Sequence, residues 1–587
     1  MTSKSIILSL KDFSLSFLGN GGYDNIVDNV SFDVEVGKVI GIVGESGSGK
    51  TVTTQSLVKL LNYPPAHIDS GTACFVSTKT NSPGTSKTAD GEHSCVDLLS
   101  LSDEALTQYR GREISCVFQN PMTSLNPSMK CGRQVAEAVK MSGDEVADIR
   151  QAVCGIFEEV GLHDVDRIYN AYPFEISGGQ RQRVMIAMAM ACRPSLIIAD
   201  EPTTALDVIV QKKILELLKS LQKKHNMSVI IISHNLSIIR AIADKVVVMN
   251  KGKVVETGTC DDIFFRPKAT YTKGLLACRP SINTKLKYLP TVEDIERLSA
   301  ENKDFSIEKY MASLKADDET VDGRITSGDA KNILTIEKLV VKYAKKRNIL
   351  GRVTEYFTAV SGVDLTIPEG STLCLLGESG CGKSTIAKSI VGLTEISSGR
   401  ICFYGKDIRE YERKLLCRKI QMIFQDPYSS LNPRMTIGQS LMEPLVVHNM
   451  LLGEAERREK AEFFLRRVGL QVKDFRKYPH EFSGGQLQRI CIARALILEP
   501  ELLICDEPVS SLDVSVQAKV LNLLQQLRED MHLSMLFITH DIAVGRHIAD
   551  KTAVMHAGMI LENDIPSKII NNPKHKYTSA LIEASLL

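Results

Sequence analysis

Short runs of apolar residues recur along the chain, and each is followed by a polar or glycine-rich segment. Short apolar runs that end in turn-like segments predict buried strands. Six of them are followed by residues of chemical interest: Val39–Val43, Leu196–Ala199, Val229–Ile232, Leu373–Leu376, Leu502–Cys505 and Met535–Ile538. Helical patterns come later in each half, at Gln180–Cys192 and Gln486–Leu498. This alternation predicts an α/β fold with a mostly parallel sheet, whose ligand site lies at the carboxyl ends of the strands.

The two halves of the chain repeat each other at a constant spacing. Five pairs of identical residues lie 306 positions apart: Gln119 and Gln425, Ser177 and Ser483, Asp200 and Asp506, His234 and His540, Tyr271 and Tyr577. A constant offset over this length indicates a duplicated domain. We therefore expect a first domain at residues 1–278, a linker at 279–332 and a second domain at 333–587.

Two segments fall outside the repeat. Lys50 and Lys383 are 333 positions apart, so the first half holds 27 extra residues (333 − 306) before Gln119. Most of them lie in Val76–Val96, which is rich in Ser, Thr and Gly and predicts an exposed loop insertion, best explained as tolerated without a function. The linker carries Pro280 and Pro290 and short helical patterns. These patterns, at Val292–Ala300 and Ser306–Leu314, predict a partly ordered tether along the surface.

Composition narrows the class of protein. Of 587 residues, 43% are hydrophobic, and 71 basic residues balance 70 acidic ones, so nothing indicates a bulk nucleic-acid binder. No apolar run approaches the roughly 18 residues that span a bilayer, and the N-terminus lacks a signal-peptide pattern. The fourteen cysteines form no C-x-x-C, which argues against zinc ribbons and disulfide frameworks and fits a reducing cytosol.

A phosphate-binding motif follows the first apolar run of each half. Both copies fit G-x-x-x-x-G-K-[ST], in which backbone N–H groups, a lysine and a hydroxyl surround the phosphates of a nucleotide. The first copy is Gly44, Glu45, Ser46, Gly47, Ser48, Gly49, Lys50 and Thr51. The second is Gly377, Glu378, Ser379, Gly380, Cys381, Gly382, Lys383 and Ser384. We expect both loops to bind ATP.

An acidic pair follows the second of these apolar runs in each half, Leu196–Ala199 and Leu502–Cys505. Asp200 and Asp506 are placed to hold Mg²⁺, directly or through water, opposite Thr51 and Ser384. The adjacent glutamates, Glu201 and Glu507, are then placed to orient or deprotonate the attacking water. Solvated acids at a strand end are the alternative, which the repetition behind two phosphate loops makes improbable.

A serine and two glycines at the start of a helix add a second anion-binding terminus to each half. These residues are Ser177, Gly178, Gly179 and Gln180 in the first half and Ser483, Gly484, Gly485 and Gln486 in the second. With this SGGQ signature the chain resembles the ATP-binding-cassette (ABC) ATPases over nearly everything outside the linker. The other motifs of that family are also present twice: the Q-loop glutamines Gln119 and Gln425, Asp207 and Asp513 downstream of the acid pairs, and the histidines His234 and His540.

The resemblance implies two tandem P-loop NTPase domains, each with a helical subdomain, that pair head to tail. Lys50 would then share one ATP with Ser483, and Lys383 would share the other with Ser177. His234 and His540 would contact the γ-phosphate or the attacking water, and Gln119 and Gln425 would join the Mg²⁺ sites. Because neither half has lost a motif, we expect two hydrolysing sites.

An aromatic residue before the P-loop usually stacks on the adenine in this family. Tyr23 and Tyr356 share the 333-residue offset and are the candidates, with Phe17 and Phe357 as alternatives. Ordinary core packing would explain an aromatic residue there equally simply.

The text around the Q-loops, VFQNPMTSLNP and IFQDPYSSLNP, resembles a narrower group, the ATPases of dipeptide, oligopeptide, glutathione and nickel importers. That resemblance implies two separate membrane permease subunits as partners and, indirectly, a solute-binding protein, at the cytoplasmic face of the membrane. The permeases would dock near Asn120–Met129 and Asp426–Met435. The competing class, ribosome-acting translation factors, typically reads DEPTNHLD where this chain reads DEPTTALD and DEPVSSLD. No nucleic-acid partner is expected.

Overall fold

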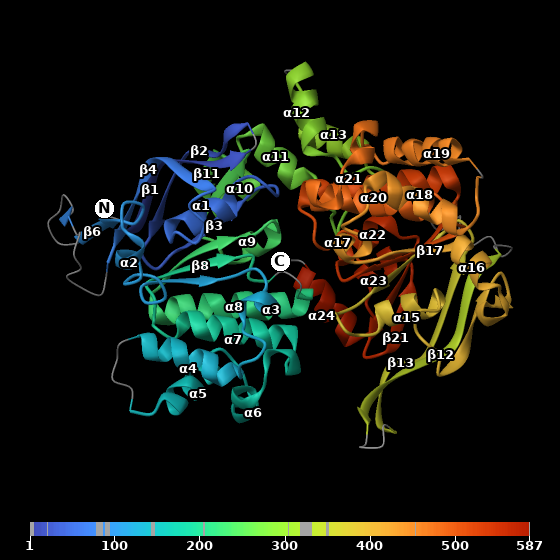
Figure 1. Ribbon diagram of the computed structural model, residues 1–587, viewed down its shortest axis with the longest axis horizontal. Helices are drawn as coiled ribbons and strands as arrows, with labels where there is room; N and C mark the ends of the chain where they lie inside the picture. Colours follow the sequence, from blue (N-terminus) through green and yellow to red (C-terminus); the bar gives the residue numbers. More distant parts are fainter. Residues whose placement is uncertain are drawn as a thin grey trace.

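The computed structural model describes residues 5–19, 21–77, 86–87, 94–142, 147–203, 206–302, 304–316, 331–347, 352–451 and 453–585. Two units of similar architecture stand side by side, one built from each half of the chain (Figure 1). Each contains a six-stranded, mostly parallel sheet and a smaller antiparallel sheet.

The first unit has its parallel sheet in the order β11-β10-β3-β9-β8-β7 and its antiparallel sheet in the order β2-β1-β4-β6-β5. Its strands are β1 (Ile6–Gly19), β2 (Gly22–Glu35), β3 (Val39–Val43), β4 (Ala66–Val76), β5 (Ser86–Lys87), β6 (Ser94–Asp97), β7 (Ile114–Val117), β8 (Leu196–Asp200), β9 (Ser228–Ile232), β10 (Lys245–Asn250) and β11 (Lys253–Thr259). Its helices are α1 (Lys50–Leu57), α2 (Asp103–Leu106), α3 (Pro121–Ser124), α4 (Cys131–Met141), α5 (Ile149–Glu159), α6 (Val165–Asn170), α7 (Gly178–Met190), α8 (Val208–His225), α9 (Leu236–Ile242), α10 (Cys260–Phe265) and α11 (Thr270–Ala277).

The second unit repeats this plan, with sheets β17-β18-β19-β14-β20-β21 and β13-β12-β15-β16. Its strands are β12 (Asn332–Arg347), β13 (Val353–Pro368), β14 (Thr372–Leu376), β15 (Ser398–Phe403), β16 (Lys406–Asp407), β17 (Ile420–Ile423), β18 (Leu502–Asp506), β19 (Ser534–Thr539), β20 (Lys551–His556) and β21 (Met559–Asp564). Its helices are α15 (Lys383–Ile390), α16 (Arg413–Lys419), α17 (Pro427–Ser430), α18 (Ile437–Val447), α19 (Glu454–Arg467), α20 (Gly484–Leu496), α21 (Val514–Met531), α22 (Ile542–Ile548), α23 (Pro566–Asn571) and α24 (Lys576–Ser585).

The six predicted strands form the centres of the parallel sheets. β3 and β14 pair with β9 and β19 in parallel register, and β8 and β18 lie next in line. Every residue of these six strands is buried, because helices and the second sheet cover both faces. The parallel arrangement brings the carboxyl ends of the strands to one edge of the sheet, where the predicted site residues follow.

The linker packs more firmly than the sequence suggests. Its helices α12 (Val292–Glu301) and α13 (Ile307–Ser313) lie where the pattern predicts them. However, Ile282, Leu286 and Leu289 are buried, so this part of the linker belongs to the core and is not a surface tether. The remainder of the linker, residues 317–330, lies outside the described residues.

The linker also binds the second unit through polar contacts. Asn522 of α21 exchanges two hydrogen bonds with the backbone of Leu289, at 2.9 and 2.7 Å. Lys519 forms an ion pair with Glu293 at 2.5 Å. The linker is therefore fixed to the helix that follows Asp513.

A disulfide between Cys74 and Cys95 was not expected from the cysteine spacing. The two residues lie on β4 and β6, antiparallel neighbours that meet only in the folded chain. Most of the predicted insertion between them, residues 78–85 and 88–93, lies outside the described residues. Among the helices that the structure describes, none has the length and apolar character needed to cross a bilayer.

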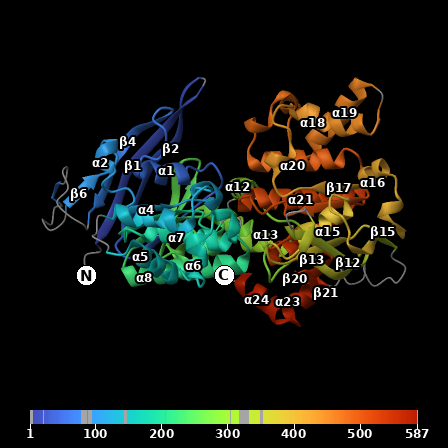
Figure 2. The same ribbon diagram turned by 60° about the horizontal axis from the view of Figure 1, so that its bottom comes forward.

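The two units run in opposite directions along their interface. In both views α1 and α20 are drawn above α7 and α15 (Figures 1 and 2). The P-loop helix of the first unit is therefore on the same side as the signature helix of the second in both views.

Candidate ATP-hydrolysing site

Each phosphate loop joins a central strand to the helix that begins at its lysine. The residues before the helices, Gly49 and Gly382, have φ values of 92° and 113°, which favour glycine. A side chain at Gly44 would also come within 2.1 Å of the carbonyl oxygen of Met249. The glycines of the motif are therefore needed for the path of the loop.

The two lysines are buried and turn back into their own loops. Lys50 Nζ donates to the carbonyl oxygens of Gly44 and Glu45, at 2.9 and 2.7 Å. Lys383 Nζ makes the same two bonds in the second loop, each at 2.7 Å. Burial lowers the pKa of Lys50, although four nearby carboxylates oppose this effect. Each loop thus encloses a cationic group beside its backbone N–H groups.

Next to each P-loop lysine, a hydroxyl side chain forms a hydrogen bond with the carboxylate at the end of a strand. Thr51 Oγ1 donates to Asp200 at 3.1 Å, and Ser384 Oγ donates to Asp506 at 3.0 Å. Burial raises the pKa of Asp200 to about 6 and also raises the pKa of Asp506. Such carboxylates are stabilised by a nearby cation, which would restore their ionised form.

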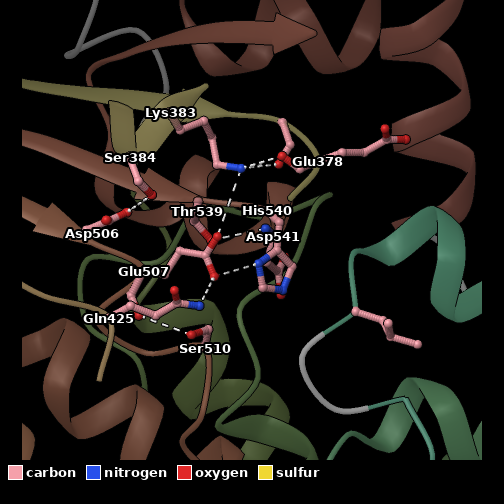
Figure 3. Close-up of polar contacts among 12 residues, drawn as sticks. Glu378, Lys383, Ser384, Gln425, Asp506, Glu507, Ser510, Thr539, His540 and Asp541 are labelled. Carbon is pink, nitrogen blue, oxygen red and sulfur yellow. Dashed lines mark hydrogen bonds and ion pairs between the residues drawn. The ribbon is translucent and has the colours of Figure 1, made fainter. Parts of the chain in front are cut away.

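Glu507, the glutamate of the second acid pair, is the centre of a polar network (Figure 3). Glu507 Oε2 accepts a hydrogen bond from Gln425 Nε2 at 3.2 Å and lies 3.2 Å from His540 Nδ1. Its other oxygen lies 3.9 Å from Lys383 Nζ. Asp506, which ends β18, faces Ser384 on the other side. Residues that are 124 positions apart along the chain (507 − 383) therefore converge on one point.

Glu201 and Glu507 both have a φ of 47°, in the left-handed region that non-glycine residues seldom adopt. Such backbone strain persists where the surrounding structure enforces it, and it concentrates at functional sites. Here it turns the glutamate out of the strand and toward the histidine.

The contact between His540 and Glu507 favours the charged form of both side chains. Burial alone would raise the pKa of Glu507, but the hydrogen bond and the charge of His540 outweigh it and lower the pKa. Burial alone would lower the pKa of His540, but the partner carboxylate raises it. A charged glutamate suits a group that accepts a proton or orients water.

The first unit has the same network with slightly shorter distances. Gln119 Nε2 donates to Glu201 Oε2 at 2.6 Å, and His234 Nδ1 lies 2.9 Å from Glu201 Oε1. In both units the Q-loop glutamine thus contacts the glutamate, while the hydroxyl contacts the aspartate.

The signature serines begin their helices as predicted. The Ser177 and Ser483 hydroxyls accept from the backbone N–H of Gln180 and Gln486, whose side chains accept in return from the serine N–H. These capping boxes fix the starts of α7 and α20. Within the described residues, both serines form these hydrogen bonds inside their own units. Contact with the opposite P-loop remains a prediction.

One contact does cross between the units at a P-loop. Asp513 Oδ2 accepts a hydrogen bond from the backbone N–H of Ser46 at 3.2 Å. A cavity of about 570 Å³ also lies between the units, lined by Asp207 and His234 of the first and by Ser379, Glu507 and His540 of the second. The second site therefore opens directly onto the first unit.

Tyr23 and Tyr356 are both exposed, at 56% and 60%. They lie on β2 and β13, three residues before Ile26 and Ala359, whose carbonyl oxygens approach the last P-loop glycines. Three residues of strand span about 10 Å, comparable to a nucleoside. Their role in adenine stacking stays a prediction.

The fold and the site define a P-loop ATPase that is present twice in one chain. The family model described as ABC transporter matches residues 27–204 and 360–510. A second model, described as the C-terminal region of oligopeptide/dipeptide transporters, matches residues 255–304. The chain belongs to the ABC transporter family, as an ATP-binding and ATP-hydrolysing protein with two cassettes.

Full-length relatives carry names from bacterial transport. The chain is 41% identical to the peptidoglycan transport ATP-binding protein YejF of Agrobacterium fabrum, over 100% of this chain and 97% of the relative. It is 38% identical to the glutathione import ATP-binding protein GsiA of Pectobacterium atrosepticum, over 100% of this chain and 90% of the relative. It is 40% identical to GsiA of Salmonella paratyphi A, over 98% of this chain and 89% of the relative.

Proposed function

We propose that this chain energises an importer of peptides or related small solutes by hydrolysing ATP in two cassettes. The observation that carries the proposal is the match of residues 255–304 to the C-terminal region of oligopeptide/dipeptide transporters. The names of the full-length relatives, which concern peptidoglycan and glutathione transport, agree with this solute class. Dipeptides, oligopeptides, glutathione and nickel are the candidate solutes.

In the proposed mechanism, Glu201 and Glu507 orient and deprotonate the water that attacks the γ-phosphate. Their ion pairs or hydrogen bonds with His234 and His540 fix the carboxylates in place. The Q-loop glutamines hold the same carboxylates from the opposite side. We propose that ATP closes the two cassettes head to tail, with Ser483 opposite Lys50 and Ser177 opposite Lys383.

The hydroxyl and carboxylate pairs fit a magnesium ion. Thr51 with Asp200, and Ser384 with Asp506, each bring two oxygen atoms within about 3.1 Å of each other beside a P-loop. Mg²⁺ prefers oxygen ligands and usually keeps several waters. We propose that these pairs hold Mg²⁺ with the nucleotide, with Gln119 and Gln425 nearby, and that the ion would neutralise charge on the phosphates.

We propose that two permease subunits dock near Asn120–Met129 and Asp426–Met435, at the cytoplasmic face of the membrane. Both segments expose large apolar side chains, with Met122 51% and Tyr428 56% exposed. Beside the second segment lies a cavity of about 310 Å³, lined by Phe424, Glu443, Val447 and Arg494 among others. A cavity lined by both apolar and charged side chains suits a short amphipathic helix of a partner.

We propose the domain division given by the repeat, with cassettes at 1–278 and 333–587 joined by the linker at 279–332. One chain then supplies both cassettes, so one chain serves two permease subunits. A solute-binding protein outside the membrane would select the solute.

The proposal is tested by affinity purification of the Glu201→Gln/Glu507→Gln chain from detergent-solubilised cells in the presence of ATP. Mass spectrometry should identify two multi-span permeases among the partners. The wild-type chain without ATP is the matched control. Recovery of ribosomes without permeases would contradict the importer and support a translation factor instead.

A further inference from the structure

The backbone of each P-loop forms a hydrogen bond with a tyrosine that belongs to none of the ATPase motifs. The Tyr577 hydroxyl accepts a hydrogen bond from the backbone N–H of Glu378 at 3.0 Å. The Tyr271 hydroxyl accepts the equivalent bond from Glu45 at 3.3 Å. The two tyrosines are 306 positions apart, so the contact is duplicated with the fold.

The tyrosines are placed by a fixed turn. Glu256 of β11 accepts backbone hydrogen bonds from Lys268 and Ala269, at 2.8 and 3.1 Å, just before α11 begins. Glu562 of β21 binds the turn before α24 in the same way, through Lys574 and His575. A strand carboxylate thus fixes the start of each helix, and the tyrosine in its first turn is aimed at the P-loop.

The tyrosine and the lysine hold the same peptide from two sides. Lys383 donates to the carbonyl oxygens of Gly377 and Glu378, while Tyr577 accepts from the N–H between them. The lysine of this motif reaches the phosphates when a nucleotide binds. The tyrosine bond does not involve the lysine side chain, so it can hold the peptide in either position of the lysine.

Helix α24 then continues to the opposite cassette. Its residues Leu581 and Ile582 pack in one apolar cluster with Ile209 of α8. Ile209 is two residues after Asp207, in the first turn of α8, so the cluster lies next to this interface aspartate. Figure 1 shows α24 beside the end of α8, between the two units.

Helix α11 reaches the second cassette through the linker. Gly274 of α11 lies against Val292, the first residue of α12. The Glu293–Lys519 ion pair then joins α12 to α21, the helix after Asp513. Each P-loop is thus connected, through its tyrosine helix, to the helix that follows the opposite cassette's interface aspartate.

We propose that Tyr271 and Tyr577 are positioning residues for ATP hydrolysis, which hold the first peptide of each P-loop and couple it to the opposite cassette. Losing the hydroxyl should weaken ATP binding, because the loop would be less ordered. It should also reduce cooperativity, because the P-loop would no longer be fixed to the helix that contacts the other cassette.

The test compares the full-length variants Tyr271→Phe, Tyr577→Phe and the double variant in steady-state ATPase assays. A hydrogen bond contributes about 0.5–1.5 kcal/mol, so the KM for ATP should rise about twofold to tenfold per site. We expect kcat to stay within about twofold. The Hill coefficient should fall toward 1 in the double variant.

Tyr109→Phe is the matched control. Tyr109 is buried, and within the described part of the chain its hydroxyl has no hydrogen-bond partner. Its KM and Hill coefficient should match the wild type. A second variant, Leu581→Ala, keeps the Tyr577 hydroxyl but weakens the contact with Ile209, so it should lower the Hill coefficient more than it raises KM. Tyrosine variants with unchanged KM and Hill coefficient, beside an active wild type, would overturn the proposal without touching the ATPase assignment.

Discussion

Glutamine in place of the two glutamates gives the most direct test of the chemistry. Glutamine keeps the size of Glu201 and Glu507, but it cannot act as a base, and an N–H₂ group replaces one of the two carboxylate oxygens. A positioned general base contributes about 10²-fold to 10⁴-fold to a rate. The double variant should therefore hydrolyse ATP about 10²-fold to 10⁴-fold more slowly. Its affinity for ATP should stay within about threefold, because neither carboxylate belongs to the P-loop.

The single variants test whether the two sites work independently. The networks around Glu201 and Glu507 contain the same residue types, so both sites should be competent. Independent sites would leave each single variant about half of the wild-type rate. The Ser46–Asp513 bond and the contact between Ile209 and α24 link the cassettes, so we expect each single variant to fall below about a tenth.

Phosphate release measured beside nucleotide binding separates the two effects. Glu454→Gln is the control, because this exposed glutamate begins α19 and touches neither site. A double variant that keeps a tenth or more of the wild-type turnover would refute the role given to the glutamates. Single variants at half of the wild-type rate would refute the coupling alone.

Three further outcomes are expected. The pKa of Glu507 is lowered and the pKa of His540 is raised, so their pair adds stability between pH about 4.5 and about 6.5, and this stability fades on either side of that window. The Tm difference between wild type and His540→Gln should therefore be largest inside the window. A flat difference from pH 4 to 9 would contradict the charged pair. Leu289→Ala should lower the free energy of unfolding of the second cassette by about 2–5 kcal/mol in urea titrations, while the exposed Leu393→Ala changes it by less than about 0.5 kcal/mol; equal effects would show that the linker does not stabilise this cassette. Ser177→Arg should impair nucleotide trapping at the Lys383 site and spare the Lys50 site, as photolabelling of each cassette would reveal; the opposite pattern would exclude the proposed cross-pairing.

The sequence predicted the centre of each cassette well because its signals are local and strong. Val39–Val43 was bounded correctly at both ends, and the other five strands differed by one residue at one or both ends. Strands buried on both faces need continuous apolar runs, which are easily recognised. The site followed from the same logic, since residues after parallel strands must meet at one edge of the sheet.

What the sequence did not predict depends on neighbours brought together by folding. The residues around Tyr271 do not indicate that its hydroxyl binds the P-loop at Glu45, 226 positions earlier (271 − 45). The 306-residue repeat shows only that a tyrosine occurs at the same place in both halves. The apolar residues of the linker are too widely spaced to predict a buried segment, yet Leu289 is buried against α21. The Cys74–Cys95 pair likewise depends on the pairing of β4 with β6.

Duplication makes the two sites alike, but covalent connection makes them unequal. The linker leaves the first cassette after α11 and joins α21 of the second through the Glu293–Lys519 ion pair. The P-loop of the first cassette also contacts the second cassette, through Ser46 and Asp513. Near the second P-loop the linker contributes Ile282 to the apolar cluster in which α24 meets Ile209 of α8. Because the linker joins one contact through an ion pair and the other through a buried apolar side chain, the two sites should differ in the free energy of closure even though their chemistry is the same.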